Sequence, residues 1–250
     1  RISNVPNDYL VRHGIETKDM LARISEFQAL QVCVIGDLIV DEYITCDPLG
    51  MSQEDPTLVV TPIDTQRFLG GSAIIAAHVA ELGAKVHYLS VSGNDGTGDY
   101  ARGELDRHGV DVTLLTDETR PTTLKQRFRA DGKTLLRVSH LHQGAVASVS
   151  QEELLRRFSS VVPDCQLVVF SDFNYGCLPQ ALVDDLVEVG REHCAEWNIA
   201  QYLQAAFSFL LHFLAVEPVS QSSIELIAQR IFQRLRRYFK MSRRLTQKEF

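Results

Sequence analysis

Short apolar runs that alternate with helical patterns are the feature that most limits how this chain can fold. The run at residues 31–36 (QVCVIG) is apolar almost throughout and ends at a Gly-Asp pair, which is typical of a strand buried on both faces of a parallel sheet. Similar runs recur at residues 85–92, 110–116 and 166–171. We therefore expect an α/β fold in which parallel strands are wound with helices.

Helical patterns fill the intervals between these runs. A glycine pair at residues 70–71 opens a helix predicted at residues 72–82. Ser150 and Glu153 have the spacing of a capping box, so a helix is predicted from there to about residue 161. The remaining predicted helices lie at residues 18–27, 100–108 and 179–193.

Two segments break this alternation and look antiparallel. One is residues 58–68, and the other is residues 122–138, with Asp131 and Gly132 as the turn of a β-hairpin. We expect these segments to form a small flap, or lid, over the edge of the sheet.

Composition narrows the function classes. The formal net charge of −7 gives no overall basic surface for a nucleic-acid partner, so a small-molecule substrate is the default expectation. None of the five cysteines falls in a CxxC pair or beside a histidine at zinc-finger spacing, so we predict reduced thiols and no metal site. The amino terminus is polar, and no apolar stretch reaches the roughly 20 residues that span a bilayer. A cytoplasmic location without a membrane span is therefore predicted.

The composition changes near residue 195. Residues 1–194 hold 17 basic and 28 acidic side chains, whereas residues 195–250 hold 8 and 4, and no glycine follows Gly190. We predict a helical leader at residues 1–29, a main domain at residues 30–194 and a divergent helical tail after it. The tail is interpreted as helices that cover the sheet, although its basic second helix also suits a membrane surface or an acidic partner. A frameshifted or rearranged tail is a further alternative.

Several motifs occur in one consistent order within the predicted main domain. They are VIGDLIVD at residues 34–41, GGSA at 70–73, GNDGTG at 93–98, RPTTLK at 120–125, LLRV at 135–138 and SDFNYG at 171–176. In this order and approximate spacing they resemble the ribokinase-type (PfkB-type) carbohydrate kinases, and within that family the heptose-7-phosphate kinase branch. The resemblance covers only the amino-terminal part of such a kinase domain.

This resemblance implies a ribokinase-like wound sheet with a small β lid. It also implies transfer of a phosphoryl group from ATP, with Mg²⁺, to a hydroxyl group of a sugar or sugar phosphate. The sugar is expected between the lid and the carboxyl-terminal edge of the sheet, and a homodimer through the lid is a further expectation.

The resemblance assigns the sugar contacts to residues near the first strand. Asp41 corresponds to the sugar-binding aspartate of the family, because a carboxylate accepts hydrogen bonds from two vicinal hydroxyl groups; the alternative is a turn or cap residue. Asp37 is a second candidate. Gly70 and Gly71 permit close backbone approach and leave helix-start N–H groups free for sugar oxygens or a phosphate. Ile74 stands where the family has Asn, which removes one polar contact.

Other candidate residues are expected around the phosphate groups. Lys125, Arg127 and Arg137 lie on the predicted flap, where cations meet a sugar phosphate, although solvated strand faces show the same pattern. Asp172 and Asn174 follow the last predicted strand, and their family counterparts lie close to the transferred phosphate.

The catalytic step of the family uses a late GAGD-type loop, in which glycines and a helix amino terminus form an anion hole and the aspartate acts as base. The glycine-free stretch after Gly190 contains no such loop, and Tyr175 stands where the heptose branch has a phosphate-neutralising Lys. We therefore expect a carbohydrate kinase by family that is a poor kinase on its own, with the catalytic residues unknown. The alternative is a catalytically dead sugar-binding or interaction module. A dinucleotide-binding enzyme fits less well, because GDLIVD replaces GxGxxG after the first strand.

Overall fold

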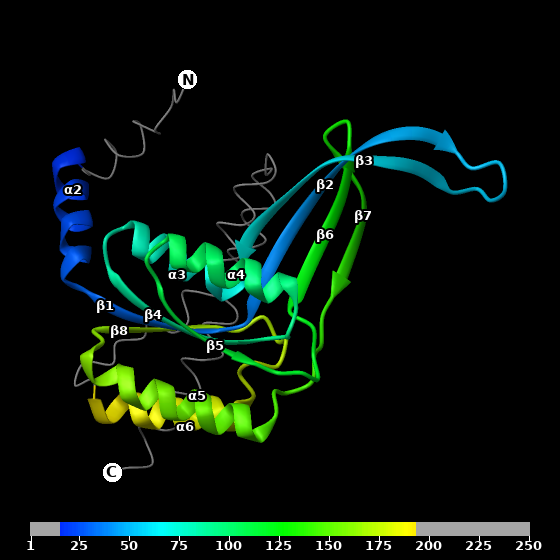
Figure 1. Ribbon diagram of the computed structural model, residues 1–250. Helices are drawn as coiled ribbons and strands as arrows, with labels where there is room; N and C mark the ends of the chain where they lie inside the picture. Colours follow the sequence, from blue (N-terminus) through cyan, green and yellow to red (C-terminus); the bar gives the residue numbers. More distant parts are fainter. Residues whose placement is uncertain (1–15, 194–250) are drawn as a thin grey trace, which may run out of the picture. The chain divides into compact units, whose positions relative to one another are not determined.

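The computed structural model describes residues 16–193, so the predicted tail after residue 194 and the first 15 residues of the predicted leader lie outside the described residues. Within them, sheet A has four parallel strands in the order β5-β4-β1-β8 (Figure 1). Its strands are β1 (Gln31–Gly36), β4 (Lys85–Ser92), β5 (Asp111–Thr116) and β8 (Leu167–Ser171). The predicted α/β fold is confirmed.

Helices cover both faces of sheet A (Figure 1). Helices α3 (Gly71–Glu81) and α4 (Gly96–Arg107) pack on one face. Helices α5 (Ser148–Val161) and α6 (Gln180–His193) pack on the other. Each of these four helices overlaps a helix that the sequence predicted.

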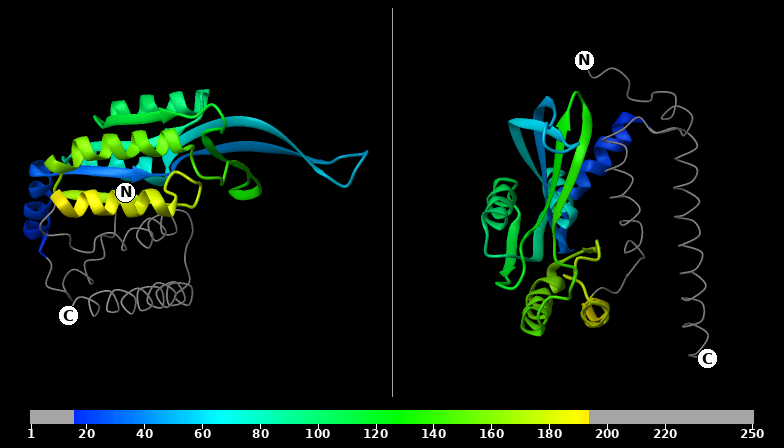
Figure 2. Two further views of the ribbon diagram at one scale, coloured as in Figure 1. Left: turned by 90° about the horizontal axis from the view of Figure 1, so that it is seen from below. Right: turned by 90° about the vertical axis from the view of Figure 1, so that its right-hand side faces the viewer.

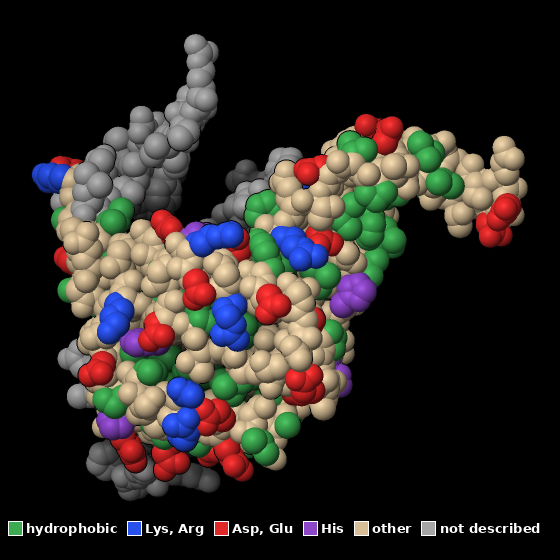
Figure 3. All heavy atoms as spheres, in the orientation of Figure 1, with side chains coloured by type: hydrophobic (Ala, Val, Ile, Leu, Met, Phe, Trp, Pro, Cys, Tyr) green, Lys and Arg blue, Asp and Glu red, His purple; other side chains and the backbone are tan. Residues whose placement is uncertain are grey.

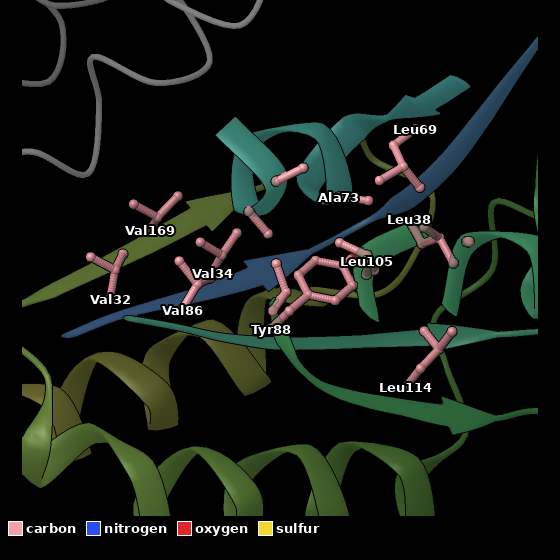
Figure 4. Packing of buried hydrophobic residues seen from close by; sticks show 14 of the residues in the cluster. Val32, Val34, Leu38, Leu69, Ala73, Val86, Tyr88, Leu105, Leu114 and Val169 are labelled. Carbon is pink, nitrogen blue, oxygen red and sulfur yellow. The ribbon is translucent and has the colours of Figure 1, made fainter. Parts of the chain in front are cut away.

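The core of sheet A divides into two clusters of buried residues. Val34 of β1 belongs to the cluster under α3 and α4, whereas the next residue, Ile35, belongs to the cluster under α5 and α6. Tyr88 is fully buried in the first cluster (Figure 4). Its hydroxyl group lies 2.7 Å from the Ser72 hydroxyl at the start of α3. Burial on both faces explains why the strands of sheet A are continuous apolar runs in the sequence.

A second sheet, sheet B, forms the predicted lid. Its strands β2 (Leu38–Met51), β3 (Leu58–Gly70), β6 (Thr123–Ala130) and β7 (Lys133–His140) lie in the order β3-β2-β6-β7. Strand β2 pairs antiparallel to β3 and parallel to β6, and β6 pairs antiparallel to β7. Figure 2 shows the β2–β3 hairpin extending well beyond the other two strands.

The two hairpins of sheet B differ in how well the sequence predicts them. The turn at Asp131 and Gly132 is confirmed, because both residues have positive φ angles, 49° and 75°, between β6 and β7. Strand β2 was not predicted as a separate element. Only Asp37 separates it from β1, so the two strands look like one apolar run followed by polar residues.

The capping box predicted at Ser150 and Glu153 is wrong. Helix α5 starts two residues earlier, at Ser148, and its N-cap is Ala147, which has no side-chain hydrogen bond. The Glu153 carboxylate accepts hydrogen bonds from arginine side chains one turn further along the helix. These ion pairs replace the backward contact on which a capping box depends.

The remaining helical elements are short or peripheral to the sheets. Helix α2 (Thr17–Glu26) confirms the helix predicted at residues 18–27, and the 3-10 turns η1 (Phe27–Ala29) and η2 (Val162–Asp164) precede β1 and β8. No helix within residues 16–193 is long and apolar enough to cross a membrane.

Candidate functional site

Asp41 lies near the start of β2, inside the lid sheet. Its neighbours across the sheet are Phe68 in β3 and Lys125 in β6, and its side chain forms an ion pair with Arg127. Only 6% of Asp41 is exposed. Asp41 follows the first strand, as expected, and it is held within a paired strand, which does not fit the alternative of a turn or cap residue.

The glycine pair lies directly beside Asp41. Gly70 ends β3, and a Cβ atom there would lie 2.5 Å from Asp41 Oδ2, so the absence of a side chain lets the carboxylate lie against the start of α3. Gly71 has a φ of 56°, in the left-handed region that favours glycine. The Ser72 N–H donates to the Asp37 carbonyl oxygen at 3.0 Å, so one of the expected free N–H groups is already used.

Several cationic side chains, among them the three predicted ones, share the face of sheet B that carries Asp41. Lys125 and Arg127 are two residues apart on β6 and therefore point to the same side of the sheet. Lys125 stands opposite Asp41, and Arg137 of β7 stands opposite Arg127. With Arg129, opposite Thr45 of β2, these positive charges outnumber Asp41 and Asp64, two carboxylates of the same face, which suits an anionic ligand.

Aromatic rings contact two of these cations. The Arg127 guanidinium carbon lies 5.1 Å from the centre of the Tyr43 ring. The Lys125 ammonium lies 4.9 Å from the ring centre of Tyr175 and 5.7 Å from that of Phe173. Such cation–π contacts are worth about 0.5–2 kcal/mol. The rings of Phe173 and Tyr175 belong to the loop after β8. Lys125 therefore connects the lid to the carboxyl-terminal edge of sheet A.

Asp37 is held by backbone groups of the loop after β8. Its carboxylate accepts hydrogen bonds from the N–H groups of Phe173 (2.7 Å), Tyr175 (3.2 Å) and Cys177 (3.1 Å). Burial, with only 3% of the residue exposed, raises the pKa of Asp37 above its ordinary value, and these three hydrogen bonds oppose that rise. Asp37 therefore helps to fix the conformation of the loop. The contact of Asp37 with sugar stays a prediction.

Asp172 and Asn174 are exposed on that same loop. The Asn174 N–H donates to Asp172 Oδ1 at 2.7 Å, and Asn174 adopts a positive φ of 64°. The loop leaves the carboxyl end of β8, where Ser171 pairs with Gly36 at the carboxyl end of β1. The two side chains therefore lie at the edge where open α/β sheets bind their ligands, as predicted from the strand pattern.

Arg120 is a residue of this region that the sequence analysis did not single out as a site residue. Its Nη2 donates to the carbonyl oxygens of His142 (3.1 Å), Gly144 (2.8 Å) and Tyr175 (3.0 Å). Backbone acceptors distant in sequence leave no pattern in the sequence. The only available signal was the place of Arg120 at the start of the RPTTLK motif.

The chain belongs to the pfkB family of carbohydrate kinases. The model of the pfkB family carbohydrate kinases matches residues 29–214. The match runs past the boundary predicted near residue 195, in a part of the chain outside the described residues.

The curated relatives agree with the branch that the motifs resemble. Bifunctional protein HldE from Desulfatibacillum aliphaticivorans is 31% identical over 167 residues, which are 66% of this chain and 34% of that protein. Bifunctional protein HldE from Helicobacter pylori (strain Shi470) is 31% identical over 164 residues, with 65% and 35% covered. The predicted resemblance to the heptose-7-phosphate kinase branch is confirmed. The chain spans about a third of the length of these relatives.

A solved structure supports the fold. A possible 1-phosphofructokinase from Thermotoga maritima aligns with a TM-score of 0.51 at 16% identity, covering 65% of this chain and 51% of that chain. At this identity the likeness concerns the fold alone, and it confirms the predicted ribokinase-like sheet.

The family implies a Mg²⁺ ion, but residues 16–193 contain no cluster of metal ligands. No group of three or more His, Cys, Asp or Glu side chains there is arranged to hold a metal ion.

Proposed function

We propose that residues 30–194 form the sugar-phosphate-binding part of a carbohydrate kinase. The observation that carries this proposal is the common face of sheet B, which Asp41 shares with Lys125, Arg127 and Arg137. A carboxylate is the acceptor that sugar hydroxyl groups need, and the cations suit a phosphate group on the same molecule.

In this proposal, the two carboxylate oxygens of Asp41 make different contacts. Oδ1 is paired with Arg127, which fixes the orientation of the carboxylate. Oδ2 lies against the bare backbone of Gly70, and in this proposal it is the oxygen that accepts a hydrogen bond from a sugar hydroxyl group. Arg127 is in turn positioned by the Tyr43 ring, so it is preorganised to contact an anionic substituent of the bound sugar.

The proposal predicts discrimination between phosphorylated and neutral sugars. Calorimetric titration should show tighter binding of a heptose 7-phosphate than of the parent heptose, with a preference that weakens as salt is added. Arg137→Gln should weaken heptose 7-phosphate binding by about tenfold, because it removes one charge-assisted contact. Lys85→Gln is the matched control, since Lys85 is exposed at the opposite, amino-terminal end of β4. Equal affinity for both sugars would contradict the proposed substrate class.

Phosphoryl transfer is a separate part of the proposal. The family implies ATP and Mg²⁺ as co-substrate and cofactor, but this sequence has no glycine after Gly190 from which an anion-hole loop could form. We propose that the chain binds sugar phosphate without turning over ATP on its own, as a sugar-binding module does. A coupled ATP-turnover assay with heptose 7-phosphate tests this, and turnover that disappears in Asp41→Ala would show an intact kinase instead.

The lid is also the proposed contact of a homodimer. The β2–β3 hairpin carries large apolar side chains along its length (Figure 3). The most exposed are Leu49 (65%), Met51 (62%) and Ile63 (66%). Side chains of this kind gathered on one arm are typical of an interaction surface.

Ile63→Glu should therefore convert a dimer into a monomer, because a charge on the apolar arm opposes burial. Sedimentation velocity measures the change, with Gln53→Glu in the hairpin turn as the control. A wild-type protein that is monomeric at all concentrations would rule out the lid dimer.

Two further proposals concern the surroundings of the protein. The formal charge of −7 supports the view that nucleic acid is not a partner. We also keep the predicted cytoplasmic location as a proposal, which fractionation of cells that express the protein would test.

A further inference from the structure

In the loop after β8, residues 172–177, backbone N–H groups are held by hydrogen bonds to one side chain. Three of its backbone N–H groups, those of Phe173, Tyr175 and Cys177, point at the single carboxylate of Asp37. Asp37 comes directly after β1, so this contact ties the loop to the centre of sheet A. The positions of these three N–H groups thus depend on the one buried side chain of Asp37.

Arg120 holds the same loop through a backbone carbonyl oxygen. One guanidinium nitrogen donates to the carbonyl oxygen of Tyr175 and also to those of His142 and Gly144, on the segment that precedes α5. The Val146 N–H donates to the Gly176 carbonyl oxygen at 2.9 Å, which joins the same two segments. Arg120 therefore supplies the donor for backbone carbonyl oxygens of both segments.

Arg120 also stands at the root of the lid. It precedes β6 by three residues, and the neighbouring Thr122 N–H donates to the Asp95 carboxylate at 2.8 Å, which fixes this part of the chain. Further along β6, Lys125 lies over the rings of Phe173 and Tyr175. The lid and the loop therefore meet twice, once through Arg120 and once through Lys125.

We propose that Arg120 and Asp37 are positioning residues that clamp the loop from both sides and set it against the lid. The inference rests on the proposed function, because its consequence is for the phosphate end of the sugar site. The clamp holds the rings of Phe173 and Tyr175, and these rings hold the ammonium group of Lys125. Loss of the clamp should therefore reduce the preference for a phosphorylated sugar more than the affinity for sugar hydroxyl groups.

The first test measures amide hydrogen exchange in the whole chain without sugar. Arg120→Ala should raise the exchange rates of the Tyr175 and Cys177 amides on the order of tenfold, while amides of β1 and β4 exchange as in the wild type. Arg120→Lys should restore part of the protection, as should added guanidinium ion. Arg102→Ala is the matched control, because Arg102 donates to a single distant carbonyl oxygen, that of Leu114.

The second test measures the ratio of affinities for heptose 7-phosphate and the parent heptose. Arg120→Ala should lower this ratio at least threefold, and Arg120→Lys should recover part of it, whereas general destabilisation would lower both affinities alike. Asp37→Asn should raise exchange at the same amides if Arg120→Ala does not fold. Unchanged exchange at Tyr175 and Cys177, or an equal rise throughout the domain, would overturn the clamp. Faster loop exchange in a protein that binds neither sugar would retain the clamp and reject the proposed function.

Discussion

Asp41→Ala is expected to weaken binding of heptose 7-phosphate by about a hundredfold or more. The substitution removes the proposed acceptor of a sugar hydroxyl group, and a hydrogen bond to a charged group contributes about 1.5–3 kcal/mol. It also leaves Arg127, whose side chain is only 12% exposed, without its carboxylate partner. Isothermal titration calorimetry on the purified protein measures the change.

The control for this prediction lies in the same strand. Asp47 is exposed further along β2, so Asp47→Ala should bind heptose 7-phosphate as the wild type does. Asp41→Asn keeps the shape and one acceptor oxygen and should give an intermediate affinity. Wild-type affinity in a folded Asp41→Ala protein would show that the sugar binds elsewhere.

Gly71→Ala is expected to lower the free energy of unfolding by about 3 kcal/mol. A side chain in the left-handed region costs about 1–2 kcal/mol. Here the new Cβ atom would also overlap the Asp37 carbonyl oxygen, which belongs to the buried backbone between β1 and β2. Urea unfolding followed by circular dichroism measures the loss of stability.

A second glycine provides the matched control for this substitution. Gly103 lies within α4, and a Cβ atom there would meet no atom within 4 Å. Gly103→Ala should raise stability by about 0.5–1 kcal/mol, because alanine loses less backbone entropy in a helix than glycine does. If both substitutions have the same effect, the tight turn at Gly71 does not limit stability.

The sequence was most informative where one local pattern determines one element. The continuous apolar runs predicted β1 and β4 with their observed limits, because both faces of sheet A are covered by helices. The Asp131-Gly132 turn predicted the β6–β7 hairpin, since few other residue pairs adopt positive φ readily. Strand β2 escaped prediction because a single residue separates it from β1.

The motifs named residues for the candidate site but not the contacts between them. Asp41, the glycine pair and the lid cations were named from motifs, and the structure brings them to one face of sheet B. The pairing of Asp41 with Arg127 joins residues 86 positions apart, and the contacts of Asp37 reach across 136 to 140 positions. Such contacts follow from strand order and register, which no local pattern in the sequence encodes.

Amide chemical shifts recorded during a titration with heptose 7-phosphate test whether the common face of sheet B holds a sugar phosphate. If it does, the largest shift changes should fall on Asp41 and its strand neighbours, on Gly70 and Gly71, and on residues 125–127 of β6. Shift changes confined to α5 and α6, or none at saturating ligand, would contradict this proposal.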